Sequence, residues 1–166
     1  MLEIIWNITL VMCAILFVAF TFVVAYGAPY LPTLRTKVPM ALDMLGLKKG
    51  QTLLELGSGD GRLLRAAAQR GLNAVGYELN PLLVIYSKLI TFRHRKQVRV
   101  IWGNYWKANW PQADGIFVFL LQPYMEKLDK KITQKQIKNI SLVSFAFTIN
   151  SKKPTKKKAG LYLYKY

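Results

Sequence analysis

The glycine-rich stretch Glu55–Arg62, ELGSGDGR, decides the fold that this sequence predicts. It follows a short apolar run, Gln51–Leu56, and precedes a segment rich in helix formers, Arg62–Arg70. An apolar run that ends at glycines is typical of a buried strand, and glycines allow a tight turn and a close approach of the backbone to a ligand. The sequence therefore predicts a strand, a glycine loop and a helix in succession.

Strands and helices alternate along the rest of the chain. Strands are predicted at Asn73–Glu78 and Gln97–Trp102, and the helix between them begins at Asn80-Pro81, a pair typical of a helix cap and first turn. The other predicted elements are a short helix at Pro39–Leu47, strands at Gly115–Leu121, Ser141–Ile149 and Leu161–Tyr166, and a helix at Tyr124–Gln136. This alternation predicts an α/β fold with a doubly wound, mostly parallel sheet, in which the last strand enters antiparallel.

An uncharged segment, Ile4–Tyr26, lies before this domain and has 23 residues. As a helix it would be ~35 Å long, enough for a hydrocarbon layer of ~30 Å, and Trp6 and Tyr26 near its ends suit the membrane interface. A cleaved signal peptide is the alternative, but its apolar core would be shorter and preceded by Lys or Arg, whereas the charged side chain before this segment is Glu3. The sequence favours one transmembrane helix.

The charges around this segment predict its orientation. No Lys or Arg precedes it, whereas Arg35 and Lys37 follow it closely. Cationic residues favour the cytoplasmic side, so we expect a single-pass membrane protein whose domain lies in the cytoplasm or its equivalent. The predicted organisation is an anchor at 1–27, a linker at 28–36 and a domain at 37–166.

The composition is both apolar and basic. Hydrophobic residues make up 52% of the 166 residues, too many for a disordered polycation, and the formal net charge is +16. One cysteine and one histidine exclude a disulfide framework within the chain and a multi-His or Cys-rich metal site, so no metal is predicted. The basic surface predicts contact with anionic lipid first and with nucleic acid second. Its lysines cluster at Lys127, Lys130, Lys131, Lys135 and Lys138 and at Lys152, Lys153, Lys156, Lys157 and Lys158.

Three acidic residues indicate the kind of cofactor. Glu78 ends the second predicted strand, 21 positions after Gly57, where a carboxylate can accept hydrogen bonds from the hydroxyls of an adenosine ribose. Dinucleotides and S-adenosylmethionine both fit that spacing. Glu55 and Asp60 beside the glycines would repel a pyrophosphate and attract the cationic amino-acid tail of S-adenosylmethionine. The sequence favours S-adenosylmethionine.

Four stretches of the chain resemble the class I S-adenosylmethionine-dependent methyltransferases. LLELGSGDGRLL is similar to their first motif and GYELNP to the acidic end of their second strand, while Asn104 matches a position that contacts adenine. FVFLLQPYM is similar to their fourth strand and following substrate loop. The resemblance implies cofactor contacts from Glu55, Gly57, Ser58, Gly59, Asp60, Gly61, Glu78 and Asn104.

The anchor followed by VPMALDMLGLKKGQTLLELGSGDG is similar to small membrane-anchored protein-lysine methyltransferases. These are related to the mitochondrial enzymes that modify the ATP synthase c-subunit and the adenine nucleotide translocase. The resemblance implies methylation of a lysine, whose neutral amine would be favoured by desolvation and by nearby acceptors. Candidate acceptors are the Leu121 carbonyl and the side chains of Gln122 and Tyr124.

Other functions remain open on the sequence. The acceptor could be a lipid or a small hydrophobic molecule delivered from the bilayer. A protein that binds the cofactor or RNA without turnover is the alternative outside enzymes. Leu-Gln-Pro-Tyr at Leu121–Tyr124 departs from the Asn-Pro-Pro-Tyr loop of many base N-methyltransferases, which disfavours nucleic-acid bases.

Overall fold

The computed structural model describes residues 1–26, 31–135 and 139–166, without the side chains of 16, 18–20 and 22–26. The chain divides into two compact units, Met1–Leu31 and Pro32–Tyr166. Residues 27–30, at the predicted boundary between anchor and linker, and Gln136, the predicted end of a helix, lie outside the described residues.

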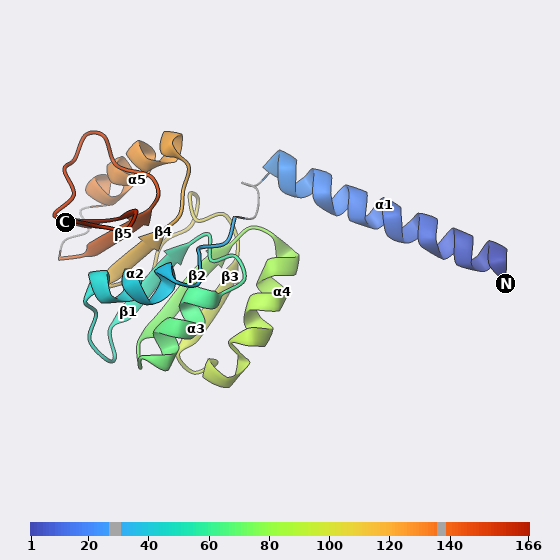
Figure 1. Cartoon of the computed structure of the whole chain (residues 1–166), viewed down its shortest axis with the longest axis horizontal. Coiled ribbons are helices and arrows are strands. Elements are labelled where there is room, and N and C mark those ends of the chain that lie inside the picture. Colours follow the sequence, from blue (N-terminus) through green and yellow to red (C-terminus); the bar gives the residue numbers. More distant parts are fainter. Residues whose placement is uncertain (27–30, 136–138) are drawn as a thin grey trace. The chain divides into compact units, whose positions relative to one another are not determined.

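The first unit contains a single long helix, α1 (Leu2–Tyr26) (Figure 1). Its described side chains are exposed, including those of Ile4, Trp6 and Phe17. Within the described residues, no helix combines the length and the apolar character of a membrane span. The predicted span Ile4–Tyr26 includes side chains outside that description and stays a prediction.

The second unit is built on one seven-stranded sheet with the order β3-β2-β1-β4-β5-β7-β6. The first five strands pair in parallel, and β7 is antiparallel to both β5 and β6. The strands are β1 (Thr52–Leu56), β2 (Asn73–Glu78), β3 (Val98–Trp102), β4 (Gly115–Val118), β5 (Ser141–Phe145), β6 (Lys156–Lys158) and β7 (Leu161–Lys165). The doubly wound, mostly parallel sheet and its antiparallel last strand are thereby confirmed.

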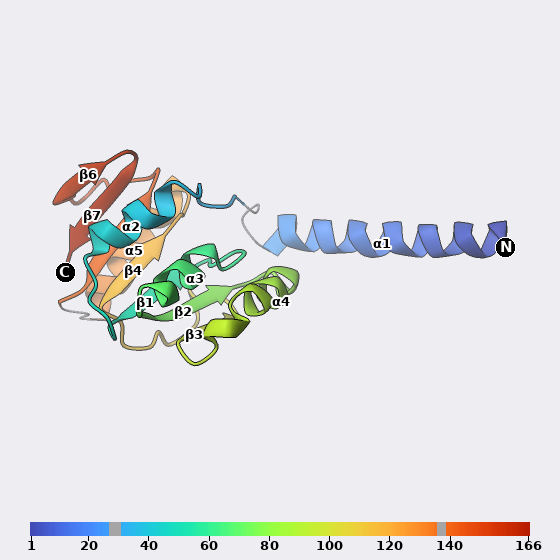
Figure 2. The ribbon, with the colours of Figure 1, turned by 60° about the horizontal axis from the view of Figure 1, so that its bottom comes forward.

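Helices cover both faces of this sheet (Figure 2). On one face lie α2 (Lys37–Leu45), α3 (Arg62–Gln69) and α4 (Pro81–Ile90). The helices α3 and α4 pack against β1, β2 and β3, whereas α2 packs against β4, β5 and β7. On the other face lies α5 (Gln122–Gln134), which buries Met125, Leu128 and Ile132 against the sheet. Both faces of the central strand β4 are buried, as its continuous apolar run predicts.

The sheet differs from the prediction at three strands. The fourth strand ends at Val118 and not at Leu121. The fifth strand is shorter than Ser141–Ile149, because Ala146 adopts a left-handed conformation with φ of 67° and ends the pairing at Phe145. The lysines of β6 form an edge strand, which the sequence did not predict. Consecutive lysines suit an edge because their charge prevents pairing with another chain.

Candidate functional site

The glycine loop between β1 and α3 folds over the end of β2. The N–H groups of Gly57 and Ser58 both donate to the Tyr77 carbonyl oxygen at 2.9 Å. Gly61 has a φ of 77°, and a Cβ at this position would lie 2.1 Å from the Ser87 hydroxyl oxygen. Any side chain at position 61 would therefore combine backbone strain with a steric clash.

Glu78 connects the two neighbouring loops at the carboxyl edge of the sheet. Its Oε2 accepts a hydrogen bond from the Gly59 N–H at 2.8 Å. Its Oε1 accepts from the N–H groups of Leu79 and Asn80 at 2.9 and 2.8 Å. A carboxylate offers about four acceptor sites, so these three bonds orient Glu78 toward the glycine loop and leave capacity for a hydroxyl of a ligand.

Glu55 lies buried beneath the same loop, near the end of β1. Its Oε2 is enclosed and has no hydrogen-bond partner among the described residues. Burial raises the pKa of Glu55 well above its ordinary value, and the nearby charges of Asp60 and Glu78 add to this rise, while Arg62 opposes it. A buried carboxyl group without a partner is costly, so a cationic or hydrogen-bonding ligand at this point would be stabilised.

Asp60 pairs with Arg62, which the sequence reasoning did not include. The Arg62 guanidinium lies 2.6 Å from the Asp60 carboxylate, and it also donates to the Thr33 carbonyl oxygen at 2.8 Å. The charge of Asp60 is thus partly balanced by Arg62, but it still contributes to the raised pKa of Glu55.

The β3 end borders Glu78 on its other side. Trp102 is in register with Glu78, and its indole N–H donates to the Leu79 carbonyl oxygen at 3.0 Å. The Asn104 side-chain oxygen accepts from the Trp106 N–H at 2.9 Å and so stabilises the turn after β3. The side-chain oxygen keeps a second lone pair and the amide nitrogen its two hydrogens, and the predicted contact of Asn104 with adenine stays a prediction.

A row of aromatic side chains continues from this turn to α5. The rings of Tyr105 and Trp106 are 4.9 Å apart, and those of Trp106 and Tyr124 are 6.1 Å apart. Burial raises the pKa of Tyr105 well above its ordinary value, with Tyr124 and Glu78 adding to the rise, so its phenol stays protonated. Tyr105 was not predicted from the sequence, because no motif distinguishes it from the tryptophans beside it.

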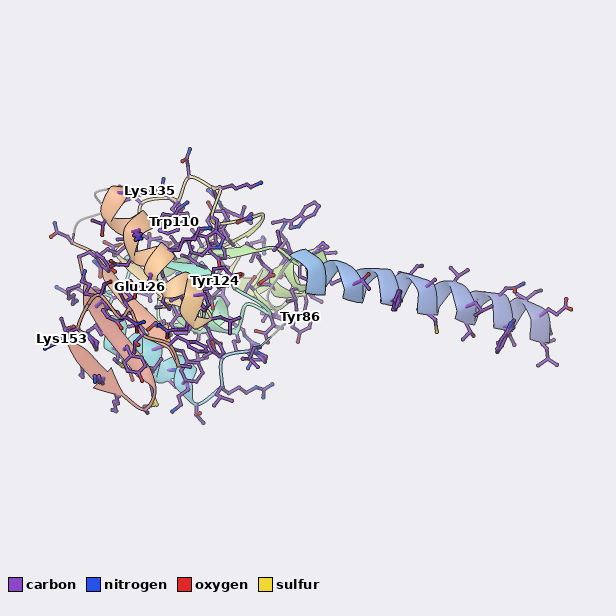
Figure 3. The ribbon with its side chains drawn as sticks, turned by 90° about the horizontal axis from the view of Figure 1, so that it is seen from above. Tyr86, Trp110, Tyr124, Glu126, Lys135 and Lys153 are labelled. Carbon is purple, nitrogen blue, oxygen red and sulfur yellow. The ribbon has the colours of Figure 1, made fainter. Side chains whose placement is uncertain are left out.

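Tyr124 and Gln122 both lie in the first turn of α5 but have different surroundings. The Tyr124 side chain is 43% exposed at the rim (Figure 3). The Gln122 amide donates to the Thr148 carbonyl oxygen at 2.8 Å and to Asn150 Oδ1 at 3.2 Å, and its oxygen accepts from the Thr148 N–H. In this conformation Gln122 holds the segment after β5, and its predicted role in positioning an amine stays a prediction.

Glu126 strengthens the same attachment one turn later on α5. Its carboxylate accepts from the Asn150 and Ser151 N–H groups and from the Ser151 hydroxyl. The hydrogen bond from the Ser151 hydroxyl is the main reason that the pKa of Glu126 is lowered. The carboxyl edge at β4 and β5 is therefore closed by internal hydrogen bonds.

Two further findings concern the rest of the described surface. A hollow of about 520 Å³ lies at the opposite, amino edge of the sheet, between Trp110, Asp114 and Lys135, away from the carboxylates of the glycine loop. Asp114 there accepts from the Thr52 N–H at 2.7 Å and thus ties β1 to the start of β4. Within the described residues, no group of histidine, cysteine and acidic side chains is arranged to hold a metal ion.

Residues 55–156 match the family described as the ANTKMT methyltransferase domain. The chain belongs to this family. The matched range of this ANTKMT-type domain includes the glycine loop, Glu78 and the first turn of α5. The resemblance to class I S-adenosylmethionine-dependent methyltransferases is therefore confirmed.

Curated relatives of the ANTKMT-type domain are lysine methyltransferases. The ATP synthase c-subunit lysine N-methyltransferase of Xenopus laevis is 38% identical over 106 residues, which cover 63% of this chain and 46% of the relative. The adenine nucleotide translocase lysine N-methyltransferase of Mus musculus is 32% identical over 129 residues, 76% of this chain and 56% of the relative. The chain thus spans about half the length of these relatives.

A solved structure with the same fold is an RNA methyltransferase from Salinibacter ruber in complex with S-adenosyl-L-homocysteine. It is 25% identical to this chain, and the alignment covers 81% of this chain and 91% of the other with a TM-score of 0.72. This agrees with a class I methyltransferase fold.

Proposed function

We propose that this protein is an S-adenosylmethionine-dependent methyltransferase that N-methylates a lysine of a membrane protein. The observation that carries the proposal is the pair of carboxylates at the glycine loop. Glu55 supplies an enclosed oxygen without a partner, and Glu78 stays oriented toward the loop with acceptor capacity left. This combination suits a ligand with a cationic tail and a ribose better than one with a pyrophosphate.

S-adenosylmethionine, when bound, supplies a methyl group on a positively charged sulfur. Glu55 would accept a hydrogen bond from the ammonium of its amino-acid part, and Glu78 would accept hydrogen bonds from the ribose hydroxyls. The open backbone at Gly57, where a Cβ would meet nothing within 4 Å, leaves room for the ligand above the loop. The side chain of Asn104 lies beyond Glu78, at the turn where the family places the adenine.

The part of the site that receives the lysine has to favour its neutral amine and hold the nitrogen in line with the methyl group. The aromatic row of Tyr105, Trp106 and Tyr124 excludes water from one side of the approach and thereby favours the uncharged amine. The Tyr124 hydroxyl can accept a hydrogen bond from that amine. With the cofactor bound, the neutral nitrogen would take the methyl group and the sulfur would leave as S-adenosylhomocysteine. The methylated ammonium would then release a proton to water.

Membrane attachment is the second part of the proposal. It is supported by the uncharged run Ile4–Tyr26, by the cations Arg35 and Lys37 that follow it, and by the curated relatives, which are named for lysines of the ATP synthase c-subunit and of the adenine nucleotide translocase. We propose a single-pass anchor with the domain on the cytoplasmic side or its equivalent. Carbonate extraction and protease protection of the full chain test both statements.

A transfer assay with a tritiated methyl group tests the reaction. The full chain is incubated with labelled S-adenosylmethionine and a membrane extract, and label is counted in protein, lipid and RNA fractions. The proposal expects label in protein, on N-methylated lysine, and loss of that label in a Glu78→Ala variant. Label confined to the lipid or RNA fraction would contradict a protein acceptor and identify lipid or RNA as the acceptor instead. No label in any fraction would contradict the enzymatic function.

RNA is the second candidate acceptor. It is favoured by the Salinibacter ruber RNA methyltransferase and by the net charge of +16. Two tryptophans that could stack on bases are already covered by lysines of α5, since Lys127 lies over the Trp106 ring at 4.6 Å and Lys131 over the Trp110 ring at 5.0 Å. This occupation makes a base-stacking platform less suitable here.

A further inference from the structure

The outward face of α4 is apolar, which reverses the usual pattern of a surface helix. Its inward face buries Val84 and Ser87, and Ser87 lies against Gly61 at the start of α3. On the opposite face, side chains spaced three or four residues apart are exposed by half or more: Leu82 by 60%, Ile85 by 65%, Tyr86 by 51% and Leu89 by 70%. We call these four residues the α4 stripe.

The chain around the α4 stripe is uniformly cationic. Residues 79–113 contain no aspartate or glutamate. Phe92 extends the apolar surface by one more exposed ring, 60% exposed, and the Arg95 guanidinium lies 4.8 Å from the centre of that ring. The exposed basic side chains of this segment are Lys88, Arg93, Arg95, Lys96, Arg99 and Lys107.

A helix with an apolar outer face and cations on its flanks is suited to lie in the interface of an anionic bilayer. Leucine and isoleucine enter the boundary between headgroups and acyl chains, while lysine and arginine remain with the phosphates. Tyr86 is an aromatic residue with a polar group, a type enriched at that depth, and so is Trp102, which is 65% exposed and donates to the Leu79 carbonyl oxygen just before α4. Charge complementarity therefore selects an anionic lipid surface as the partner.

We propose that the α4 stripe is a lipid-docking surface that lays the domain on an anionic membrane. The proposal does not depend on methyl transfer. Asn80, which caps α4 by accepting the Leu82 N–H, follows Glu78 closely, so docking would hold the carboxyl edge of the sheet near the headgroups. Tyr86 lies well apart from Tyr124 and Glu126 (Figure 3), so docking leaves the acceptor side uncovered.

Depth-dependent fluorescence of the full chain tests the proposal. Cys13→Ser removes the native thiol, and an environment-sensitive fluorophore is attached at Leu89→Cys on the stripe. The matched control carries the same fluorophore at Lys130→Cys, an exposed position of α5 on the other face of the sheet. Vesicles of phosphatidylcholine, with or without phosphatidylglycerol, contain a lipid-attached quencher.

The proposal expects quenching and a blue shift at position 89 with anionic vesicles, and neither at position 130. Ile85→Ser in the labelled chain removes one apolar side chain that would enter the bilayer. It should lower the ratio of docked to undocked protein about tenfold. Quenching at 130 alone would assign docking to the lysines of α5 and overturn the proposal. A blue shift that grows with protein concentration without vesicles would assign the stripe to a second copy, and no change in any vesicle would exclude lipid.

Titration of the same samples with S-adenosylmethionine separates this proposal from the proposed function. Cofactor binding without quenching at position 89 would overturn lipid docking alone. Quenching without cofactor binding would overturn the methyltransferase proposal alone.

Discussion

The carboxyl edge of the sheet has two halves that differ in how far their polar groups are satisfied. At β1 and β2, Glu55 keeps an oxygen without a partner and Glu78 has acceptor capacity left. At β4 and β5, the side chains of Gln122 and Glu126 form hydrogen bonds with the segment 148–151. We call the first half the donor half, because the proposed function places the cofactor there, and the second the acceptor half. In the acceptor half Gln122 and Glu126 are hydrogen-bonded within the chain, whereas Tyr124 is exposed.

This difference suggests how the two halves act. A site that is to bind a cofactor with a fixed structure can be prepared in advance, since the ligand completes its hydrogen bonds. A site that binds a side chain of another protein needs surrounding residues in fixed conformations and one or two polar groups that are available for hydrogen bonding. Substitutions in the two halves should therefore separate cofactor binding from acceptor positioning.

Gly61→Ala should have the largest effect on the donor half. Its φ of 77° costs a side chain about 1–2 kcal/mol, and the overlap with Ser87 adds about 1–3 kcal/mol. We expect a lower melting temperature and loss of cofactor binding, measured by thermal unfolding and calorimetry. Gly50→Ala is the control, because Gly50 has a φ of 86° with nothing within 4 Å, and it should show strain without loss of binding.

A second substitution isolates the clash. Ser87→Gly should restore part of the stability in the Gly61→Ala chain, because it removes the atom that the new Cβ would meet. If Gly61→Ala and Gly50→Ala lower the melting temperature and the cofactor affinity equally, the packing of the loop against Ser87 has no special role.

Glu78→Ala should reduce cofactor affinity about 100-fold, because charge-assisted hydrogen bonds contribute about 1.5–3 kcal/mol each. The change also releases the Gly59 N–H from the loop. Calorimetry with S-adenosylmethionine measures the effect. Glu126→Ala is the matched control, since that carboxylate also accepts backbone N–H groups but lies in the acceptor half, and its cofactor affinity should be unchanged.

Gln122→Ala should mainly affect stability. Losing the bonds to Thr148 and Asn150 should lower the free energy of unfolding by about 1–2 kcal/mol and leave cofactor affinity unchanged. Denaturant unfolding and calorimetry measure the two quantities. Full stability combined with a loss of methyl transfer would instead favour the predicted contact with the substrate amine.

Tyr124→Phe should lower the rate of methyl transfer about tenfold, because it removes one hydrogen bond to the reacting amine. Stability and cofactor affinity should be preserved. Rates under saturating cofactor measure this effect. An unchanged rate would remove the Tyr124 hydroxyl from the acceptor half.

The donor half could be predicted from the sequence because its chemistry depends on local spacing. Three glycines after an apolar run, and an acid at the end of the next strand, predict a turn with Glu78 beside it, and Glu78 does accept a hydrogen bond from the Gly59 N–H. Its contact with a ribose stays a prediction. The pairing of Asp60 with Arg62 was missed, because the same two residues could equally have faced solvent.

The acceptor half was less predictable because its contacts join residues far apart in the chain. Gln122 bonds to Thr148 across 26 positions, and nothing in Leu-Gln-Pro-Tyr indicates that partner. The early end of β5 depends on the left-handed conformation of Ala146, which an alanine rarely adopts. The apolar stripe of α4 is visible in the sequence, but its exposure depends on how α4 packs on the sheet.

Proton release on cofactor binding tests the central claim, that Glu55 receives a cationic ligand. The raised pKa of Glu55 means that the free protein carries a proton there at pH values between the ordinary and the raised value. A bound ammonium would favour the carboxylate, so binding should release a proton and tighten as pH rises through that range. Calorimetry of S-adenosylmethionine in two buffers of different ionisation enthalpy should show this release in the natural chain and none in Glu55→Gln, whereas equal proton counts in both chains, or no binding at all, would contradict the account.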